Sequence, residues 1–457
     1  MAESTYTLDQ VRAATWVLSE ALQTARADYV LVVCDEYTED TALCLRTVGE
    51  AEVGARVEIL TVPFDEQRAF SKCKAELPDK KLRKLVESAS RVIILQRIAS
   101  DVSYFRLNLL EYCQRSHQRR AASMPGVTLD YLPLCLGDLD KITQRCQHVA
   151  DLMVRSTSAR LVTRSVAGRE LELSMRLGQH KPIKSTGRIE AGDWGNVPSG
   201  EIFIVPDQGT TKGMVAINGS LLDYPIPSGE DLVLRLRDGI VESPVAATGG
   251  TRSASSRLLF DEFGREVFSR CSELCELGIG TNEHITRFTG MQLFDEKILG
   301  TVHLGFGRNK QFGGNIDSPV HHDLVIRDPA LFLDEIPVTQ GGCFVLQESD
   351  VYPNWRTLRR NAIAPSSEIR AGPQTSARDG NTLFLKWMAP RSLTEQRTQV
   401  GDDETSAMAA RILDLVEEEK EPIQVSRIPT ILNGGVDDAA VSAVVALLAR
   451  FRLIELT

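Results

Sequence analysis

The stretch YVLVVC, residues 29–34, is an unbroken run of apolar residues between two segments with helical periodicity. A run without alternation is typical of a strand that is covered on both faces. A strand-like stretch follows at RVEILTV, 56–62, and another at RVIIL, 91–95, and a further strand is expected near 127–132. Because helical patterns separate these strands, residues 1–158 are predicted to form a doubly wound α/β domain.

The pattern changes after residue 158. Short alternating stretches such as RELELSMR, 169–176, predict a mainly antiparallel β-rich domain over residues 159–400, with one helix expected at 261–277. Residues 407–457 show the order helix, strand, helix, turn, helix, strand, which is typical of a small winged-helix-like domain. This last segment has five basic and eight acidic residues, a net charge of 5 − 8 = −3. That balance favours a peptide or protein contact, or dimerisation, over DNA.

Length and charge exclude several classes of protein. With 457 residues, 42% of them hydrophobic, the chain is expected to hold several domains of about 100 to 200 residues each. Its net charge of −10 argues against nucleic acid or an anionic membrane as a partner. Nine cysteines and a start without a basic and apolar leader predict a cytoplasmic location. The richest apolar run, 439–451, is too short to span a bilayer.

Histidines gather in one part of the predicted β domain. Four of the seven lie between residues 284 and 322. In SPVHHDLVI, 318–326, a strand would place His321 and Asp323 on one face and His322 on the other. A neutral imidazole beside a carboxylate is a suitable pair of ligands for a divalent metal. The alternative is a hydrogen-bonded pair on a solvated face.

Three further residues could join this pair. His303 lies in the apolar stretch TVHLGFG, 301–307, where an imidazole without a partner would be costly to bury. Glu201 directly precedes the apolar run IFIVP, and Glu276 directly precedes LGIG. A buried carboxylate is tolerated mainly when it is paired or bound to a metal.

Four motifs occur in an order that resembles the aminopeptidase T family of metallo-aminopeptidases. They are NVPSGEIF at 196–203, ELGIGTN at 276–282, LFDEK at 293–297 continuing to GTVHLGFG at 300–307, and SPVHHD at 318–323. The resemblance covers roughly residues 25 to 330 and implies a homodimer. It also implies that a two-metal centre is bound by Glu201, Glu276, His303, His321 and Asp323.

The resemblance implies a hydrolase that acts on the N-terminus of peptides. Three carboxylates and two imidazoles suit two divalent ions, most simply zinc, with cobalt or manganese able to substitute. Such ions would acidify a water and polarise the peptide carbonyl. Glu296 is the candidate general base near that water; alternatively, it only forms a surface pair with Lys297.

The sequence departs from this family at one position near the third motif. The family often has a tyrosine seven residues after the motif's histidine, whereas Lys310 stands there. An ammonium group would repel metal unless it points away. Lys310 is therefore a candidate substrate-binding residue. His284 is a second candidate for binding substrate, and its alternative is an ordinary loop histidine.

Two other functions stay open. The family also resembles ring-cleaving dihydroxypyridine dioxygenases, and His303, His321 and Asp323 would satisfy a mononuclear Fe(II) site with two histidines and one carboxylate. The presence of both Glu201 and Glu276 favours the two-metal centre. Alternatively, the chain binds or tailors a precursor peptide in natural-product maturation without cleaving it, helped by the winged-helix-like segment.

Overall fold

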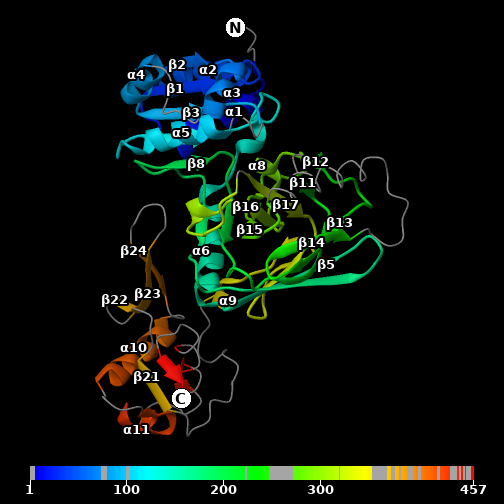
Figure 1. Ribbon diagram of the computed structural model, residues 1–457. Helices are drawn as coiled ribbons and strands as arrows, with labels where there is room; N and C mark the ends of the chain where they lie inside the picture. Colours follow the sequence, from blue (N-terminus) through cyan, green and yellow to red (C-terminus); the bar gives the residue numbers. More distant parts are fainter. Residues whose placement is uncertain are drawn as a thin grey trace.

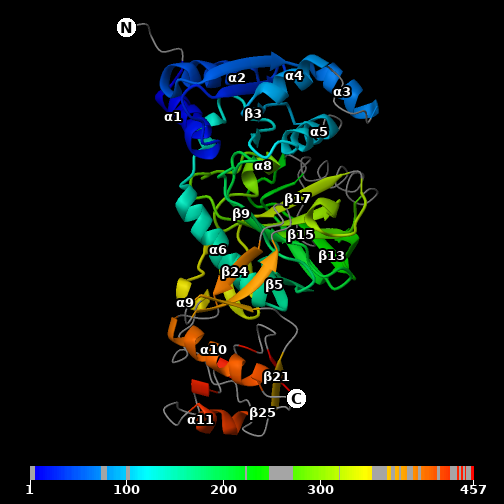
Figure 2. The same cartoon turned by 90° about the vertical axis from the view of Figure 1, so that its left-hand side faces the viewer.

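The structure is a computed structural model. It describes residues 6–73, 80–98, 103–221, 224–245, 271–318, 320–351, 368–371, 376–379, 382–388, 395–399, 403–418, 423–432, 440–441, 444–445, 448 and 454–456. From the N-terminus the elements form a parallel sheet with its helices, then two antiparallel sheets, then a small C-terminal group (Figures 1 and 2).

Five strands form a wholly parallel sheet in the order β2-β1-β3-β4-β8. Their bounds are β1 (Tyr29–Cys34), β2 (Arg56–Thr61), β3 (Arg91–Ile94), β4 (Arg120–Ser123) and β8 (Trp194–Asn196). The first three coincide with the apolar runs that predicted them. The edge strand β8 comes from the segment that otherwise forms antiparallel sheets, so the chain returns to the first sheet before it enters the site described below.

Helices cover both faces of this sheet. One face is covered by α1 (Leu8–Trp16), η1 (Val17–Ala21), α2 (Glu39–Val48) and η2 (Gly49–Val53), and the other by α3 (Phe64–Cys73), α4 (Lys80–Ser88) and α5 (Ser103–Gln114). Alternate residues of β1 enter different cores, since Val30 and Val32 pack with α1 and α2 whereas Leu31 and Val33 pack with α4 and α5. The predicted combination of a parallel α/β sheet with antiparallel sheets is therefore confirmed.

Two antiparallel sheets make up the centre of the molecule. The eight-stranded sheet has the order β14-β13-β10-β6-β5-β18-β19-β20. Its strands are β5 (Ser158–Arg164), β6 (Glu170–Arg176), β10 (Lys212–Ile217), β13 (Leu232–Arg237), β14 (Ile240–Val245), β18 (Ala330–Leu333), β19 (Ile336–Gln340) and β20 (Cys343–Phe344). The seven-stranded sheet has the order β12-β11-β17-β16-β15-β9-β7. Its strands are β7 (Ile183–Ser185), β9 (Glu201–Ile204), β11 (Ser220–Leu221), β12 (Tyr224–Pro225), β15 (Leu274–Gly280), β16 (Val302–Gly307) and β17 (His321–Ile326).

A single apolar core lies between these two sheets. Leu277, Leu304 and Leu324 of the seven-stranded sheet share it with Leu161 and Leu173 of the eight-stranded sheet. The long helix α6 (Leu139–Arg155) contributes to the same core and connects the parallel sheet to the antiparallel ones. Shorter helical segments are η4 (Leu132–Cys135), α8 (Gln292–Asp295), η6 (Lys310–Phe312) and α9 (Glu348–Val351).

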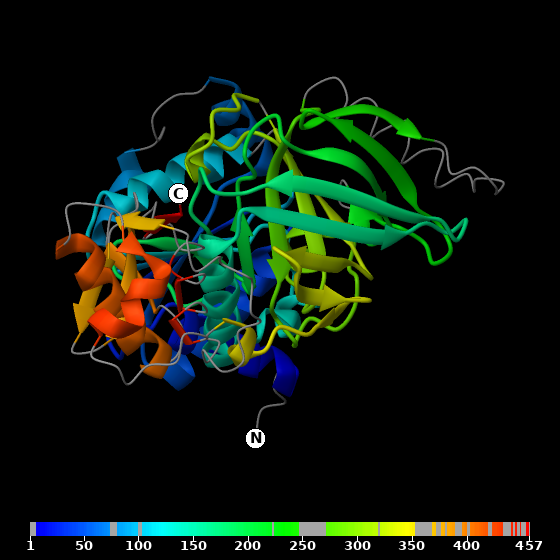
Figure 3. The same ribbon diagram turned by 90° about the horizontal axis from the view of Figure 1, so that it is seen from below.

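The C-terminal elements have a small core of their own, against which Val154 of α6 packs. They are the sheet β25-β21-β26, the sheet β22-β23-β24 and three helical segments, which Figure 3 shows from below. Their bounds are β21 (Glu368–Ala371), β22 (Ser376–Asp379), β23 (Thr382–Met388), β24 (Glu395–Gln399), α10 (Asp403–Glu418), β25 (Ile423–Gln424), η7 (Val425–Arg427), α11 (Ile428–Ile431) and β26 (Ile454–Leu456). The winged-helix interpretation and the domain boundaries at 158, 400 and 407 stay predictions.

Two local predictions are wrong. The fourth parallel strand is β4, residues 120–123, whereas 127–132 forms turns closed by bonds such as that from Thr128 N to Gly126 O. The expected helix at 261–277 is contradicted over 271–277, where β15 begins at Leu274, and residues 261–270 lie outside the described part of the chain. Every residue of β15 is buried between two partner strands, and such packing outweighs local helix propensity.

No helix in the described part of the chain is long and apolar enough to cross a membrane. The eight cysteines whose side chains are described form no disulfide. The predicted cytoplasmic location stays a prediction.

Candidate metal centre

The five predicted ligands lie on one face of the seven-stranded sheet. They come from four neighbouring strands: Glu201 from β9, Glu276 from β15, His303 from β16, and His321 and Asp323 from β17. Residues that pair directly across antiparallel strands point to the same side, and the register places all five on the face opposite the apolar core. We call these five residues the ligand cluster.

Glycines make room for the ligand cluster. Gly278 pairs with His303, and Gly305 pairs with both Glu276 and Asp323. A Cβ atom on Gly278 would lie 1.9 Å from Nε2 of His303, and one on Gly305 would lie 2.8 Å from Oδ1 of Asp323. The motifs ELGIG and HLGFG therefore need glycine at these positions because a larger residue would displace a ligand.

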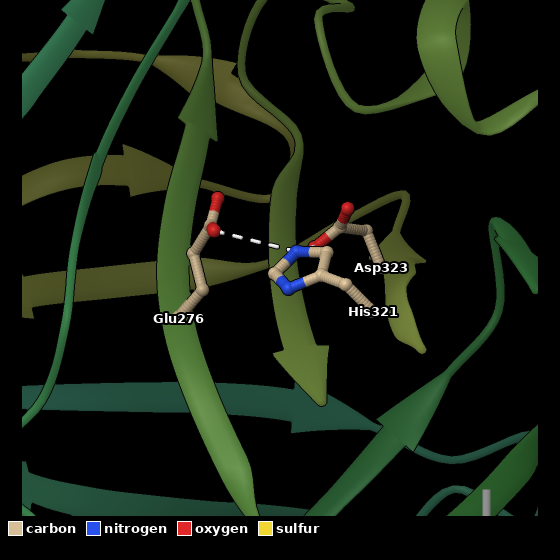
Figure 4. Close-up of side chains that lie close together, drawn as sticks. All are labelled: Glu276, His321 and Asp323. Atoms are coloured by element: carbon tan, nitrogen blue, oxygen red, sulfur yellow. Dashed lines mark hydrogen bonds and ion pairs between the residues drawn. The ribbon is translucent and has the colours of Figure 1, made fainter. Parts of the chain in front are cut away.

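Glu276 occupies the centre of the ligand cluster. Its Oε1 lies 3.3 Å from Nε2 of His303, and its Oε2 lies 3.5 Å from Nε2 of His321. Nε2 of His303 is also 3.7 Å from Oε2 of Glu201, and Nε2 of His321 is 3.2 Å from Oδ1 of Asp323. The carboxylate of Glu276 therefore lies between two pairs of possible metal ligands, His303 with Glu201 and His321 with Asp323. Figure 4 shows Glu276, His321 and Asp323 close together.

Hydrogen bonds orient the side chains of β17. Nδ1 of His321 lies 2.8 Å from the carbonyl oxygen of Arg308. A carbonyl can only accept, so this nitrogen carries the proton and a neutral ring offers the lone pair of Nε2 to a metal. Gln292 at the start of α8 donates to Oδ2 of Asp323, which leaves Oδ1 facing His321.

A buried lysine lies at the edge of the ligand cluster. Lys297 is 0% exposed, and its Nζ lies 3.2 Å from Oε1 of Glu201 and in direct contact with Oε1 of Glu296. Glu296 therefore forms a buried pair with this lysine and not a surface pair. Its proximity to the cluster fits the predicted general base, although the role itself stays a prediction.

The carboxylates change the pKa values of both histidines. Burial alone lowers the pKa of His303, but its hydrogen bond to Glu276 and the charges of Asp323 and Glu201 outweigh burial and raise it to about 9. Burial also lowers the pKa of His321, but the charge of Asp323, its hydrogen bond and the contact with Cys275 together outweigh burial and raise it. Burial, with the nearby charge of Asp323, raises the pKa of Glu276. The excess of negative charge in the ligand cluster therefore favours the protonated histidines, and it would favour a bound metal cation in the same way.

The residues present fit a divalent cation. The ligand atoms of Glu276, His321 and Asp323 lie within 4.8 Å of one another, and the first and last of these residues are buried. Oε2 of Glu276 and Nδ1 of His303 are buried and form no hydrogen bond. Imidazole nitrogens together with carboxylate oxygens suit zinc, cobalt, manganese or iron. A possible metal site therefore exists, while the identity and number of its ions stay predictions.

The remaining predicted residues lie at the periphery. Lys310 is exposed and pairs with Asp317 at 2.7 Å, so its ammonium group does not enter the ligand cluster. His284 is an exposed loop residue whose backbone N–H donates to Asn282. Their substrate-binding roles stay predictions. Cys275 is buried in β15 beside His321, with its Sγ atom 3.4 Å from Nδ1.

Two neighbours of the ligand cluster are missed when the sequence alone is considered. Lys297 was expected only as a surface partner of Glu296, and Gln292 was not singled out. Lys297 is the last residue of the motif LFDEK and Gln292 directly precedes the motif, so their spacing from Glu296 is visible in the sequence. What the sequence does not show is that α8 ends at the site and brings the lysine inward.

Comparisons with known proteins agree with both resemblances seen in the motifs. The model of the NicX family, 2,5-dihydroxypyridine 5,6-dioxygenase, matches residues 135–346, which include the whole ligand cluster. The structure of a 2,5-dihydroxypyridine dioxygenase from Pseudomonas putida KT2440 is similar over 74% of this chain and 97% of its own, with 18% identity and a TM-score of 0.56. That identity shows a shared fold alone.

A second solved structure is also similar. AmpT from Thermus thermophilus matches over 74% of this chain and 99% of its own, with 13% identity and a TM-score of 0.49. No curated protein matches the chain.

Proposed function

We propose that this chain is a metal-dependent hydrolase that releases residues from the N-terminus of peptides, with the ligand cluster as its metal centre. The observation that carries the proposal is the position of Glu276, whose two oxygens face different histidines, His303 and His321. A carboxylate placed in this way is suited to bridge two cations. Zinc is the simplest choice for such ligands, with cobalt or manganese as substitutes.

The charges around the site support this proposal. Glu201, Glu276 and Asp323 supply three carboxylates, Glu296 supplies a fourth once it has lost its proton, and Lys297 supplies one ammonium. With neutral histidines, 3 − 1 = 2 negative charges remain while Glu296 is protonated and 4 − 1 = 3 when it is not, and one or two divalent cations would largely neutralise them. Bound there, a cation would polarise the peptide carbonyl and lower the pKa of a bound water.

Glu296 is suited to move the proton. Burial, only partly offset by the charge of Lys297, raises its pKa to about 8. A carboxyl group with a pKa near neutrality can accept a proton from water and return it to the leaving amine. Glu296 lies next to the ligand cluster, because the Nζ of Lys297 contacts its Oε1 and also lies 3.2 Å from Oε1 of Glu201.

A metal and activity assay tests the proposal. Full-length protein is freed of metal with a chelator, reloaded with zinc, cobalt or manganese, and given short peptides with free or acetylated N-termini. We expect bound metal, cleavage of the free peptides only, and a loss of about 100-fold or more in Glu276→Gln. The matched control Asp317→Asn, at an exposed position outside the ligand cluster, keeps full activity. Equal cleavage of acetylated peptides, or no metal binding, would refute the proposal.

The match to the NicX family favours one second candidate, an iron-dependent ring-cleaving dioxygenase. The compact group Glu276, His321 and Asp323 has one histidine and two carboxylates, in contrast to the expected set of His303, His321 and Asp323. Oxygen uptake with Fe(II) and 2,5-dihydroxypyridine tests this candidate, and uptake without peptide cleavage would replace the hydrolase.

A precursor-peptide-binding role and a homodimer stay predictions. Peptide capture without cleavage, weakened by deletion of residues 407–457, would support the former.

A further inference from the structure

Two phenylalanine rings lie next to the ligand cluster. Phe203 follows Glu201 by two residues in β9, so both side chains point to the same face of the seven-stranded sheet. The ring of Phe312, in η6, packs edge to face against Phe203, with ring centroids 4.9 Å apart. Phe312 also packs edge to face against the imidazole of His321, with centroids 5.6 Å apart. A row of three rings therefore ends on a predicted metal ligand.

The ligand cluster is most accessible at His321. The side chain of His321 is 15% exposed, whereas those of the other four members are 6% exposed or less. Phe203 is buried, but Phe312 is only partly buried. A molecule that binds at the metal centre would therefore approach it along His321, where the ring of Phe312 lies.

Hydrogen bonds fix the segment that carries Phe312. Asn309 directly precedes η6 and is buried. Its Nδ2 donates to the carbonyl oxygen of Cys275 in β15 at 3.3 Å, and its Oδ1 accepts from Ile316 N at 2.9 Å. The carbonyl oxygen of Asn309 accepts from Phe312 N at 2.9 Å. Because Cys275 directly precedes Glu276, these bonds connect Phe312 to the strand that carries the central ligand.

We infer that Phe312 lines a subsite for an aromatic ring, which packs on Phe312 while a polar group of the same molecule binds at the metal centre. Aromatic pairs favour edge-to-face and offset-stacked arrangements, so a bound ring would extend the row formed by Phe203, Phe312 and His321. Because hydrogen bonds already hold its segment in place, Phe312 loses little conformational freedom when a ligand binds.

This inference rests on the proposed function, since it names the substrates that the metal centre would prefer. For a peptidase, the ring is the side chain of an aromatic residue at the N-terminus of the peptide. The ring of a dihydroxypyridine has the same packing chemistry, so the experiment includes both sources of the ring.

Binding measurements test the subsite without any turnover. Full-length protein, before and after zinc is added, is titrated calorimetrically with L-phenylalaninol, L-alaninol and 2,5-dihydroxypyridine. We expect L-phenylalaninol to bind at least about tenfold more tightly than L-alaninol, because only L-phenylalaninol has a ring to pack on Phe312. Phe312→Ala should remove most of this preference and leave L-alaninol binding unchanged, whereas Phe312→Tyr, which keeps the ring, should retain the preference.

Controls separate a binding role of Phe312 from a structural one. Phe332→Ala removes a partly buried phenylalanine of β18, in the other antiparallel sheet, whose ring packs under the guanidinium group of Arg160. This variant should leave the preference for L-phenylalaninol unchanged. An equal loss of both amino alcohols in Phe312→Ala would mean that Phe312 only supports the metal centre, and it would overturn the subsite.

The same titrations separate this inference from the proposed function. If peptide cleavage fails but the binding of either aromatic compound depends on Phe312, the subsite stands and the hydrolase falls. If only the binding of 2,5-dihydroxypyridine depends on Phe312, the subsite stands and the peptide as the source of the ring falls. Undetectable binding of all three compounds in both forms of the protein, or aromatic binding that Phe312→Ala leaves unaltered, would overturn the subsite.

Discussion

Replacing Lys297 with methionine should strongly destabilise the metal-free protein. The methionine fills most of the volume of the lysine but removes the ammonium group that lies 3.2 Å from Glu201 and in contact with Glu296. At 3.2 Å and an effective dielectric constant of about 20, each attraction amounts to about 5 kcal/mol. Desolvation of the lysine offsets part of this, and loss of one partner of a buried pair typically costs about 3–5 kcal/mol.

Urea unfolding followed by circular dichroism, in the presence of a chelator at pH 9, measures this loss. We expect Lys297→Met to lower the free energy of unfolding by about 3–5 kcal/mol. The matched control is Lys310→Met, whose ammonium pairs with Asp317 on the surface and should cost less than about 1 kcal/mol. The double variant Lys297→Met with Glu296→Gln should recover part of the loss, since it removes a carboxylate left without a partner.

Zinc provides a second readout of the same change. The variant has one more unneutralised negative charge beside the ligand cluster, so added zinc should stabilise it more than it stabilises the wild type. If Lys297→Met is no more destabilising than Lys310→Met, the ammonium does not balance buried charge, and the electrostatic account of this site is wrong.

Three further results are expected. Gly278→Ala should weaken zinc binding about 10- to 100-fold, because the new Cβ would lie 1.9 Å from Nε2 of His303. Competition with a chromophoric chelator measures the affinity, and an unchanged value would contradict the need for glycine at this position. Zinc at a hundredfold excess over its Kd should stabilise the wild type by about 2.7 kcal/mol and so raise its melting temperature. Asp323→Asn should abolish this rise in melting temperature, whereas Asp317→Asn should keep it. The pKa of Glu296, raised from 4.5 to about 8, means that its contribution to stability is present in acid and lost as pH rises to about 8. Metal-free wild type should therefore lose more unfolding free energy between pH 6 and pH 9 than Glu296→Gln, and parallel pH curves would exclude this carboxyl as the cause.

Local patterns predicted much of the fold and the ligand cluster. The apolar runs at 29–34 and 91–95 locate β1 and β3, because a strand buried on both faces must be apolar. The stretch at 56–62 locates β2, an edge strand that is only partly buried. The pair His321 and Asp323 could be placed on one strand face because side chains of a strand alternate. Their convergence with the other three ligands was an inference from ordered motifs, and the register of four strands supports it.

Tertiary structure decided what depends on distant partners. The segment 271–277 has helical periodicity, yet β15 begins at Leu274 because it pairs with β16 and, from Leu277 on, also with β9. The burial of Lys297 depends on where α8 ends. Sequence spacing and periodicity report only on neighbours along the chain. Burial of charge and repulsion between charges depend instead on the dielectric surroundings and on distances that arise when the layers pack.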